Sequence, residues 1–199
     1  MPLISVVLTT FNEMPHKLPV AVHSILDQTF QDFEFLIYHD GRNSQSFTDT
    51  SNFVNGLDQI ETLTFFALQE QRGLTGYPMR QDSLQYVGGD YIVFSNGDNY
   101  HTRDYLQYFA REVIADPNID FVYVNGLHDY AGAPWTVLDS RPGMGAIDMA
   151  FFMTRTSLMK EIGFTDFSRG GDGTLVDTLA SRGVKMKKVP NGAVTVVHG

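Results

Sequence analysis

Apolar and amphipathic stretches alternate along the first part of the chain. Short, almost continuous apolar runs at residues 3–11, 33–41, 61–68 and 90–95 predict buried strands. Each is followed by a segment with apolar residues every three or four positions, which predicts helices at 18–28, 46–57, 77–87 and 102–116. Four strand–helix alternations are typical of the α/β class, with a mostly parallel central sheet and helices on both faces.

The second part of the chain has a less regular pattern. We expect strands at 121–130, 184–190 and 193–199, with a further candidate at 132–139. Residues 145–163 run from a loop into a strand or helix, and 171–183 form a helix with Asp172 at or near its N-cap. No repeat, linker or low-complexity tract interrupts this pattern, so we predict a single domain over residues 1–199.

Composition narrows the range of functions. The net charge is −9 and the sequence pI about 4.9, which argues against a nucleic-acid partner. Cysteine is absent, which excludes disulfides, zinc–thiolate sites and a cysteine nucleophile. No stretch is long and apolar enough to form a transmembrane segment, and the N-terminus lacks the layout of a signal peptide. These features together favour a cytoplasmic location.

Polar residues follow the predicted strands where a parallel sheet usually binds its ligand, beyond the carboxyl ends. The stretch "FSNGDNY" (94–100) is the most informative, because a buried strand ends there in a carboxylate between amides. A turn would explain this composition. A metal and phosphate site is the sharper interpretation, since Asp98 suits a hard cation such as Mn²⁺ or Mg²⁺. The other polar residues at strand ends are Thr9, Thr10, Asn12, Glu13, His39, Asp40, Asn96 and Asn99.

Several ordered motifs resemble those of family 2 glycosyltransferases, which have the GT-A fold. They are "SVVLTTFNE", "SILDQTFQDFEFLI", "GYPMRQDSLQYVGGDYIVFSNGDNY" and "EIGFTDFSRGGDGTLVDTLASRG", and the resemblance runs from about Ser5 to His198. It implies a nucleotide-sugar-binding half over 1–100 and an acceptor and catalytic half over 101–199. The implied donor is a UDP-, GDP- or dTDP-sugar, and the implied acceptor a glycan or small-molecule hydroxyl.

The resemblance assigns the nucleoside to residues after the first two strands. Thr9 and Thr10 would lie beside base and ribose, with Asn12 in the same loop, and Asp40 would recognise the base. A carboxylate at that place can accept a ring N–H of uracil or guanine. The alternative for Asp40 is a loop residue in its own Asx-turn, and Thr9 could equally be a buried strand residue.

The diphosphate and metal are assigned to a second group of residues. Arg80 would face the diphosphate, since its planar fork pairs with phosphate through two hydrogen bonds; a surface arginine is the alternative. In Asn96-Gly97-Asp98 the family's first acid is an amide, which can still bind a ribose hydroxyl, whereas Asp98 keeps the metal role. His198 would be an extra metal ligand, although a frayed terminal histidine is an equal alternative.

Asp172 is the predicted catalytic base, which would take a proton from the acceptor hydroxyl during inverting transfer. The family's preceding Glu is here Gly171, and a purely structural role as N-cap is the alternative. By position, Trp135 and Asp148 would face the acceptor.

Two other functions compete with the proposed transfer. The amide at Asn96 and the missing Glu at 171 motivate an inactive module that only binds sugar nucleotides. A dinucleotide-dependent oxidoreductase is disfavoured, because the first strand-to-helix turn, "TTFNEMPHK", lacks G-x-G-x-x-G.

Overall fold

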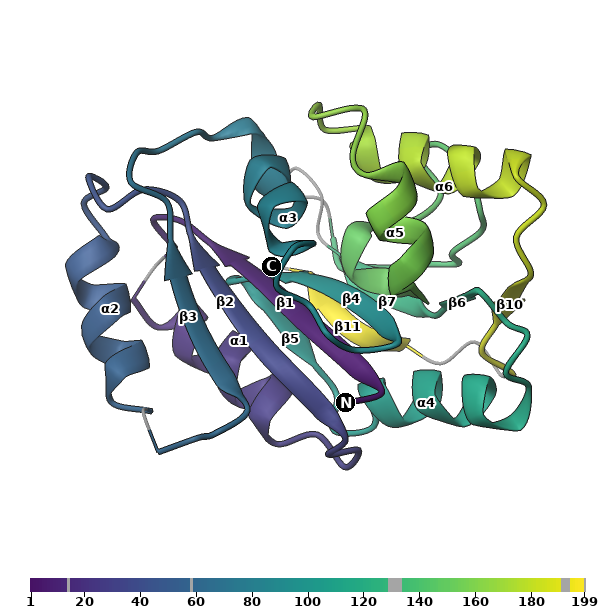
Figure 1. Cartoon of the computed structure of the whole chain (residues 1–199), viewed down its shortest axis with the longest axis horizontal. Coiled ribbons are helices and arrows are strands. Elements are labelled where there is room, and N and C mark those ends of the chain that lie inside the picture. The colour runs from purple at the N-terminus through teal and green to yellow at the C-terminus, as the bar shows by residue number, and fades with distance from the viewer. Residues whose placement is uncertain (14, 58, 129–133, 191–193, 199) are drawn as a thin grey trace.

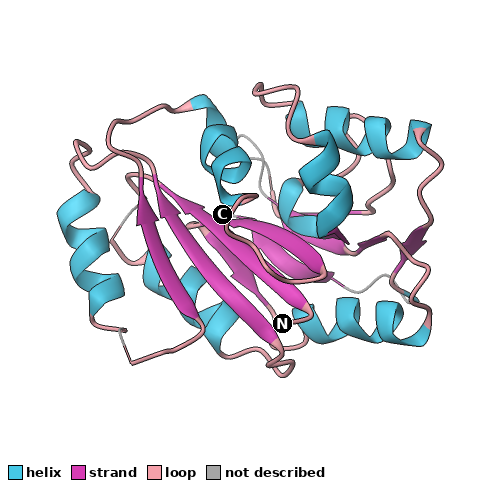
Figure 2. Ribbon diagram, viewed as in Figure 1, coloured by secondary structure: helices cyan, strands magenta, loops and turns pink. Residues whose placement is uncertain are grey.

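The protein is built around one large sheet with helices on both sides (Figures 1 and 2). The structure, a computed structural model, describes residues 1–13, 15–57, 59–128, 134–190 and 194–198, the last of these for the backbone alone. The helices are α1 (Lys17–Leu26), α2 (Phe47–Asn55), α3 (Tyr77–Ser83), α4 (Tyr105–Ala115), α5 (Thr156–Ile162) and α6 (Gly171–Ser181).

The large sheet has seven strands in the order β10-β6-β9-β4-β1-β2-β3. Strands β1 to β4 run parallel, and only β9 is antiparallel to its described neighbours β4 and β6. The predicted mostly parallel α/β fold is therefore confirmed. The bounds are β1 (Ile4–Thr10), β2 (Phe33–His39), β3 (Leu63–Ala67), β4 (Tyr91–Asn96), β6 (Phe121–Tyr123), β9 (Phe152–Arg155) and β10 (Met186–Lys188).

Strand β1 occupies the middle of the parallel part. All seven of its residues are buried, as a continuous apolar run predicts for a strand covered on both faces. The arrowheads of β1, β2 and β3 point to the same edge in Figure 1. The register pairs Thr9 with Tyr38 and Asn96, and Thr10 with His39. Polar strand ends that are far apart in the sequence are thus neighbours in space.

A smaller four-stranded sheet lies against the large one, in the order β5-β11-β7-β8. Its strand β5 was not predicted; it comes directly after Asp98 and pairs with β11. The bounds are β5 (Asn99–His101), β7 (Asn125–His128), β8 (Thr136–Leu138) and β11 (Val194–His198).

The predicted strand at 121–130 is wrong in its continuity. It breaks at Val124 into β6 and β7, which belong to different sheets. The N–H of Val124 donates to the carbonyl of Phe151, and a Cβ on Gly126 would lie 1.9 Å from the Phe151 ring. The chain therefore bends where this aromatic ring packs against bare backbone. Residues 129–133, which include parts of the predicted strands at 121–130 and 132–139, lie outside the described residues.

Segment 145–163, for which the sequence predicted a loop followed by either a strand or a helix, contains three short elements. A 3₁₀ turn at Met149–Phe151 leads into β9 and then α5. The predicted helix 77–87 ends early, at Ser83, because residues 84–86 turn towards the glycine pair at 88 and 89.

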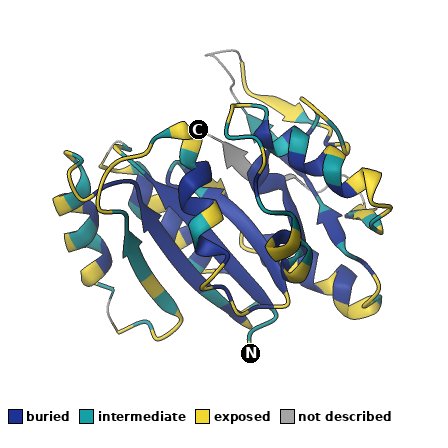
Figure 3. Cartoon of the chain, turned by 45° about the horizontal axis from the view of Figure 1, so that its top comes forward, coloured by how far each residue is buried: buried dark blue, intermediate teal, exposed yellow. Residues whose placement is uncertain are grey.

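Figure 3 shows buried residues concentrated in the strands of the sheet and exposed ones on the outer sides of the helices.

The glycine pair before β4 yields a sharp test of this packing. A Cβ on Gly89 would lie 2.6 Å from the Ser5 nitrogen and 2.8 Å from the Ile4 carbonyl carbon, both backbone atoms of β1. A Cβ on Gly88 would be 3.7 Å from its nearest neighbour, Glu34. We expect Gly89→Ala to lower the free energy of unfolding by about 1–3 kcal/mol, the usual cost of overpacking. Gly88→Ala is the matched control and should change it far less. Urea unfolding measures both, and equal effects would contradict the close approach.

Candidate functional site

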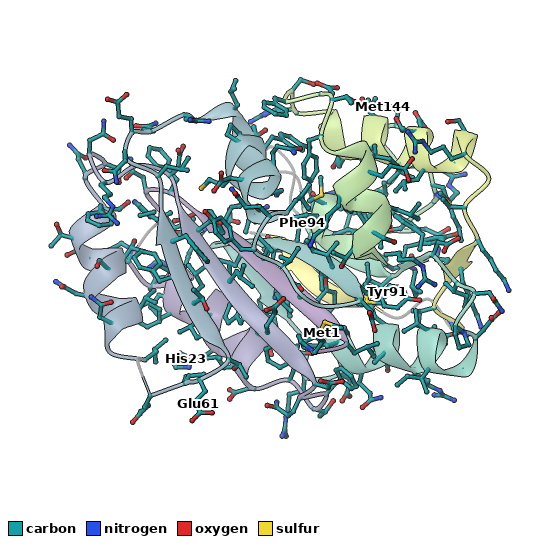
Figure 4. All side chains as sticks on the ribbon, in the orientation of Figure 1. Met1, His23, Glu61, Tyr91, Phe94 and Met144 are labelled. Carbon is teal, nitrogen blue, oxygen red and sulfur yellow. The ribbon has the colours of Figure 1, made fainter. Side chains whose placement is uncertain are left out.

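A cavity of about 630 Å³ opens at the carboxyl edge of the parallel strands. Its walls come from the ends of β1, β2 and β4, from segment 73–80 and from residues of the second half of the chain. Met144, labelled in Figure 4, belongs to the wall beside α6. The residues predicted from sequence that line this cavity are Thr9, Thr10, Asp40, Arg80, Asn96, Asp98, Asp148 and Asp172.

Four predicted residues fall elsewhere or are described only in part. Gly97, which was assigned to the donor site, is buried beside Glu13 and does not line the cavity. Asn12 is exposed and lies in a separate depression of about 360 Å³ beside α2, where its N–H donates to Ser46. Trp135 is about half exposed and does not line the cavity. The backbone of His198 pairs with Asn99 and His128, but its side chain lies outside the described residues.

Two arginines line the cavity, the exposed Arg169 and the buried Arg80, of which only 3% is exposed. Helix α3 carries it inward, and its Nη1 donates to the Thr75 carbonyl at 2.7 Å. Its Nη2 donates to the Thr9 hydroxyl at 3.3 Å and to the Asn96 side-chain oxygen. The guanidinium lies 5.1 Å from the ring centre of Tyr77, within cation–π range. Sequence analysis left a surface position open for Arg80, and the structure excludes it.

Asp40 holds the loop that leads to Arg80. Its two carboxylate oxygens accept the backbone N–H groups of Arg72 and Gly73 at 2.8 and 2.7 Å. The next residues, 74 and 75, are non-glycine residues with positive φ of 52° and 50°, a strained conformation often found at functional sites. Asp40 therefore has a structural role in addition to the predicted recognition of the base, which stays a prediction.

Glu13 is a cavity residue that sequence analysis noted at a strand end but did not assign. Its carboxylate accepts the Thr10 hydroxyl at 2.6 Å and the Phe11 N–H at 2.8 Å, which folds it back over the end of β1. Burial raises its pKa, and the negative charge of Asp98 adds to this shift. A Cβ on Gly97 would lie 2.9 Å from the Glu13 carboxyl carbon, so glycine at 97 makes room for this carboxylate.

Asp172 is the second residue of α6, whose N-cap is Gly170. It lines the cavity, and its carboxylate accepts the Gly173 N–H at 2.7 Å. Burial raises the pKa of Asp172 to about 6, and the charge of Asp148 acts in the same direction. The Gly173 hydrogen bond and Arg80 act against the shift. The cavity thus contains a carboxyl group whose proton affinity suits a base near neutral pH.

Comparison with protein families decides how this cavity is classified. The model of glycosyl transferase family 2 matches residues 5–175, most of the chain. The chain belongs to glycosyl transferase family 2. An uncharacterized glycosyltransferase from Methanocaldococcus jannaschii is 29% identical over 98 residues, which cover 49% of this chain and 32% of that protein. Another, from Haemophilus influenzae, is 27% identical over 107 residues, or 54% of this chain and 40% of that protein. Each match thus spans well under half of the relative's length.

Solved structures of glycosyltransferases share the fold. S. aureus TarS 1–349, determined in complex with UDP-GlcNAc, superposes with a TM-score of 0.75 at 18% identity over 98% of this chain and 57% of that chain. The mannosyltransferase PcManGT from Pyrobaculum calidifontis, in complex with GDP-Man and Mn²⁺, gives 0.75 at 17% identity over 99% of this chain and 56% of that chain. These likenesses confirm the predicted GT-A fold.

Position 171, where the resemblance to the family leads one to expect Glu, is closely packed in the structure. A Cβ on Gly171 would lie 2.3 Å from the Asp166 carbonyl oxygen and 2.7 Å from the Tyr77 ring. Tyr77 is buried, stacks on Phe167 and lines the cavity. It occupies the space into which a side chain at 171 would point, so any larger residue at 171 would require Tyr77 or the Asp166 backbone to shift. Tyr77 carried no signal in the sequence, because nothing there places it against α6.

The acidic residues of the cavity do not by themselves form a complete set of metal ligands, so a bound ligand would have to supply the others. Within the described part of the chain, no group of three or more His, Asp or Glu side chains is arranged to hold a metal. Asp98 nevertheless supplies a carboxylate at the predicted place in the wall. Mg²⁺ is commonly bound by one or two carboxylates plus substrate phosphates, and this composition is compatible with that mode.

The raised pKa of Asp172 has a measurable effect on stability. A carboxyl group whose pKa is higher in the folded than in the unfolded protein destabilises the fold as pH rises through the interval between the two values, here from about 4 to about 6. Asp172→Asn removes this penalty. Relative to wild type, its free energy of unfolding should therefore increase over that interval by about 1–2 kcal/mol, less than the full shift because the group is partly solvated. Urea unfolding at pH 4, 6 and 8 measures the difference, and a constant difference would contradict the assignment.

Proposed function

We propose that the protein is an inverting glycosyltransferase that moves a sugar from a nucleoside-diphosphate sugar to an acceptor hydroxyl. The observation that carries the proposal is the placement of Asp172 in one cavity with Arg80 and Asp98, in a chain of family 2. A base, a cation for the leaving group and a carboxylate for a metal are the groups that such a transfer requires.

The donor would bind along the ends of β1, β2 and β4. Thr9, Thr10 and Asp40 lie on the side where the nucleoside is expected, and Asn96 is within hydrogen-bonding distance of Thr9. PcManGT was solved with GDP-Man and TarS with UDP-GlcNAc, which supports a nucleotide sugar as the class of donor. We propose a UDP-, GDP- or dTDP-sugar.

Asp98 would hold a divalent cation, Mn²⁺ or Mg²⁺, which offsets the negative charge of the donor phosphates. The Mn²⁺ in the PcManGT structure supports this choice for a related fold. We further propose His198 as a second metal ligand. Arg80 would bind the same phosphates through its charge and through the one N–H of Nη1 that has no acceptor in the protein.

Asp172 would accept the proton of the acceptor hydroxyl as this oxygen attacks the anomeric carbon from the face opposite the diphosphate. With a pKa of about 6 it is mostly ionised at neutral pH yet more basic than an exposed aspartate. Asp148 contributes to that basicity through its charge and lies in the same wall. The acceptor would be a glycan or a small molecule.

The location proposed for the protein is cytoplasmic. In the part of the chain that the structure describes, no helix is both long and apolar enough to cross a bilayer.

The proposed transferase activity is tested first by a screen of UDP-, GDP- and dTDP-sugars, with Mn²⁺, Mg²⁺ or EDTA, for release of the nucleoside diphosphate. Binding of one donor without turnover under every condition would favour an inactive binding module instead.

Asp98→Ala tests the metal site. We expect the mutant to lose the part of nucleoside-diphosphate affinity that depends on Mn²⁺, because the proposed carboxylate ligand is gone. Isothermal titration calorimetry with and without Mn²⁺ measures it. Asp90→Ala is the matched control, since Asp90 is exposed just before the other end of β4. Unchanged metal-dependent binding in Asp98→Ala would refute the role of Asp98.

Asp172→Asn tests the base. The amide can still accept the Gly173 N–H, so we expect the fold and the donor affinity to be retained. Turnover at saturating donor and acceptor should fall roughly 10²-fold or more, the usual contribution of a positioned general base. Asp177→Asn, an exposed position on the same helix, is the control. Near-normal transfer by Asp172→Asn would place the base elsewhere, with Asp148 and Asp166 as the next candidates.

A further inference from the structure

Arg80 is a buried charge whose direct hydrogen bonds are all to neutral groups. Its acceptors are the carbonyl of Thr75, the hydroxyl of Thr9 and the amide oxygen of Asn96. Its Nε is buried without a hydrogen-bond partner. A guanidinium has five N–H donors, and these three bonds leave two unused.

No carboxylate forms an ion pair with Arg80 among the residues that the structure describes. Asp98, Asp148 and Asp172 influence it only through longer-range electrostatics, and burial lowers its pKa. Arginine is rarely buried this deeply unless it is paired, because desolvation of the charge is costly. Since Arg80 lines the cavity, the missing counter-ion is best explained as an anionic ligand that binds there.

Position 96 decides whether the protein itself supplies that counter-ion. The side-chain oxygen of Asn96 already contacts Nη2 of Arg80. A carboxylate in the same place would form a buried ion pair and would also oppose the approach of any anion. The amide keeps the hydrogen bond and omits the charge. The positive charge of Arg80 therefore stays available to a ligand.

We propose that Asn96 keeps Arg80 without a counter-ion, so that the cavity binds a diphosphate anion even when no metal is present. The identity of this anion as the donor's diphosphate rests on the proposed function. The binding of the anion at Arg80 rests on the burial and the hydrogen bonds of Arg80. Asn96 is in this view a specificity-determining residue that favours a metal-independent mode of binding.

Inorganic pyrophosphate in the presence of EDTA is the direct probe, because it contains neither base nor sugar. Calorimetry should detect one pyrophosphate per wild-type chain. Asn96→Asp should weaken this binding at least about tenfold, since one full negative charge is added beside Arg80. The same mutant should unfold at a higher urea concentration without ligand, because the buried cation gains a partner. Asn55→Asp, exposed on α2 and outside the cavity, adds the same charge and should change neither quantity.

Two results would overturn the inference: wild type that binds no pyrophosphate in EDTA, or Asn96→Asp that binds it as tightly as wild type. If Asn96→Asp does not fold, Arg80→Gln provides the second test, and pyrophosphate binding equal to wild type would equally overturn it. The outcome is separable from that of the proposed function. Pyrophosphate binding with this dependence on residue 96, but without turnover of any sugar nucleotide, would uphold the anion site and refute glycosyl transfer.

Discussion

The parallel pairing of β1 with β2 on one side and β4 on the other is the constraint on which the site depends. It brings the carboxyl ends of three strands to one edge, with Thr9 beside Asn96 and Thr10 beside His39. Just before β4, Gly89 lies so close to the backbone of β1 that a Cβ there would overlap it. The cavity opens at this edge, and loops and helices from the second half of the chain complete it.

Among the residues that the structure describes, the buried cation of this cavity, Arg80, forms no ion pair. One buried guanidinium, that of Arg80, is in contact with neutral oxygens, whereas Glu13 and Asp172 are carboxyl groups whose pKa values burial raises. An arrangement optimised for stability alone would pair such charges or expose them. Buried ionisable groups with perturbed pKa values cluster at functional sites, where a ligand can supply an opposite charge.

Two glycines of the site, Gly97 and Gly171, each lie against a side chain that comes from a distant part of the sequence. Gly97 makes room for the carboxylate of Glu13, which is held over the end of β1. Gly171 makes room for the ring of Tyr77 from α3. The glycine at 171 therefore fits the packing of Tyr77 against α6, and the aspartate that follows it lines the cavity. The loss of the Glu does not by itself indicate loss of the site.

The pattern of apolar residues was sufficient to predict the α/β class and the first four strands and helices, because local periodicity and strand ends depend on nearby residues. The ordered motifs similarly identified the family and several polar residues of the cavity wall, among them Arg80, Asp98 and Asp172. Long-range packing decided the rest. The break at Val124, the unpredicted strand β5 and the position of Tyr77 depend on partners far away in the chain. Likewise, only the tertiary structure shows that Arg80 is buried and has no carboxylate partner among the described residues, since burial and charge pairing are properties of the folded surroundings rather than of the local sequence.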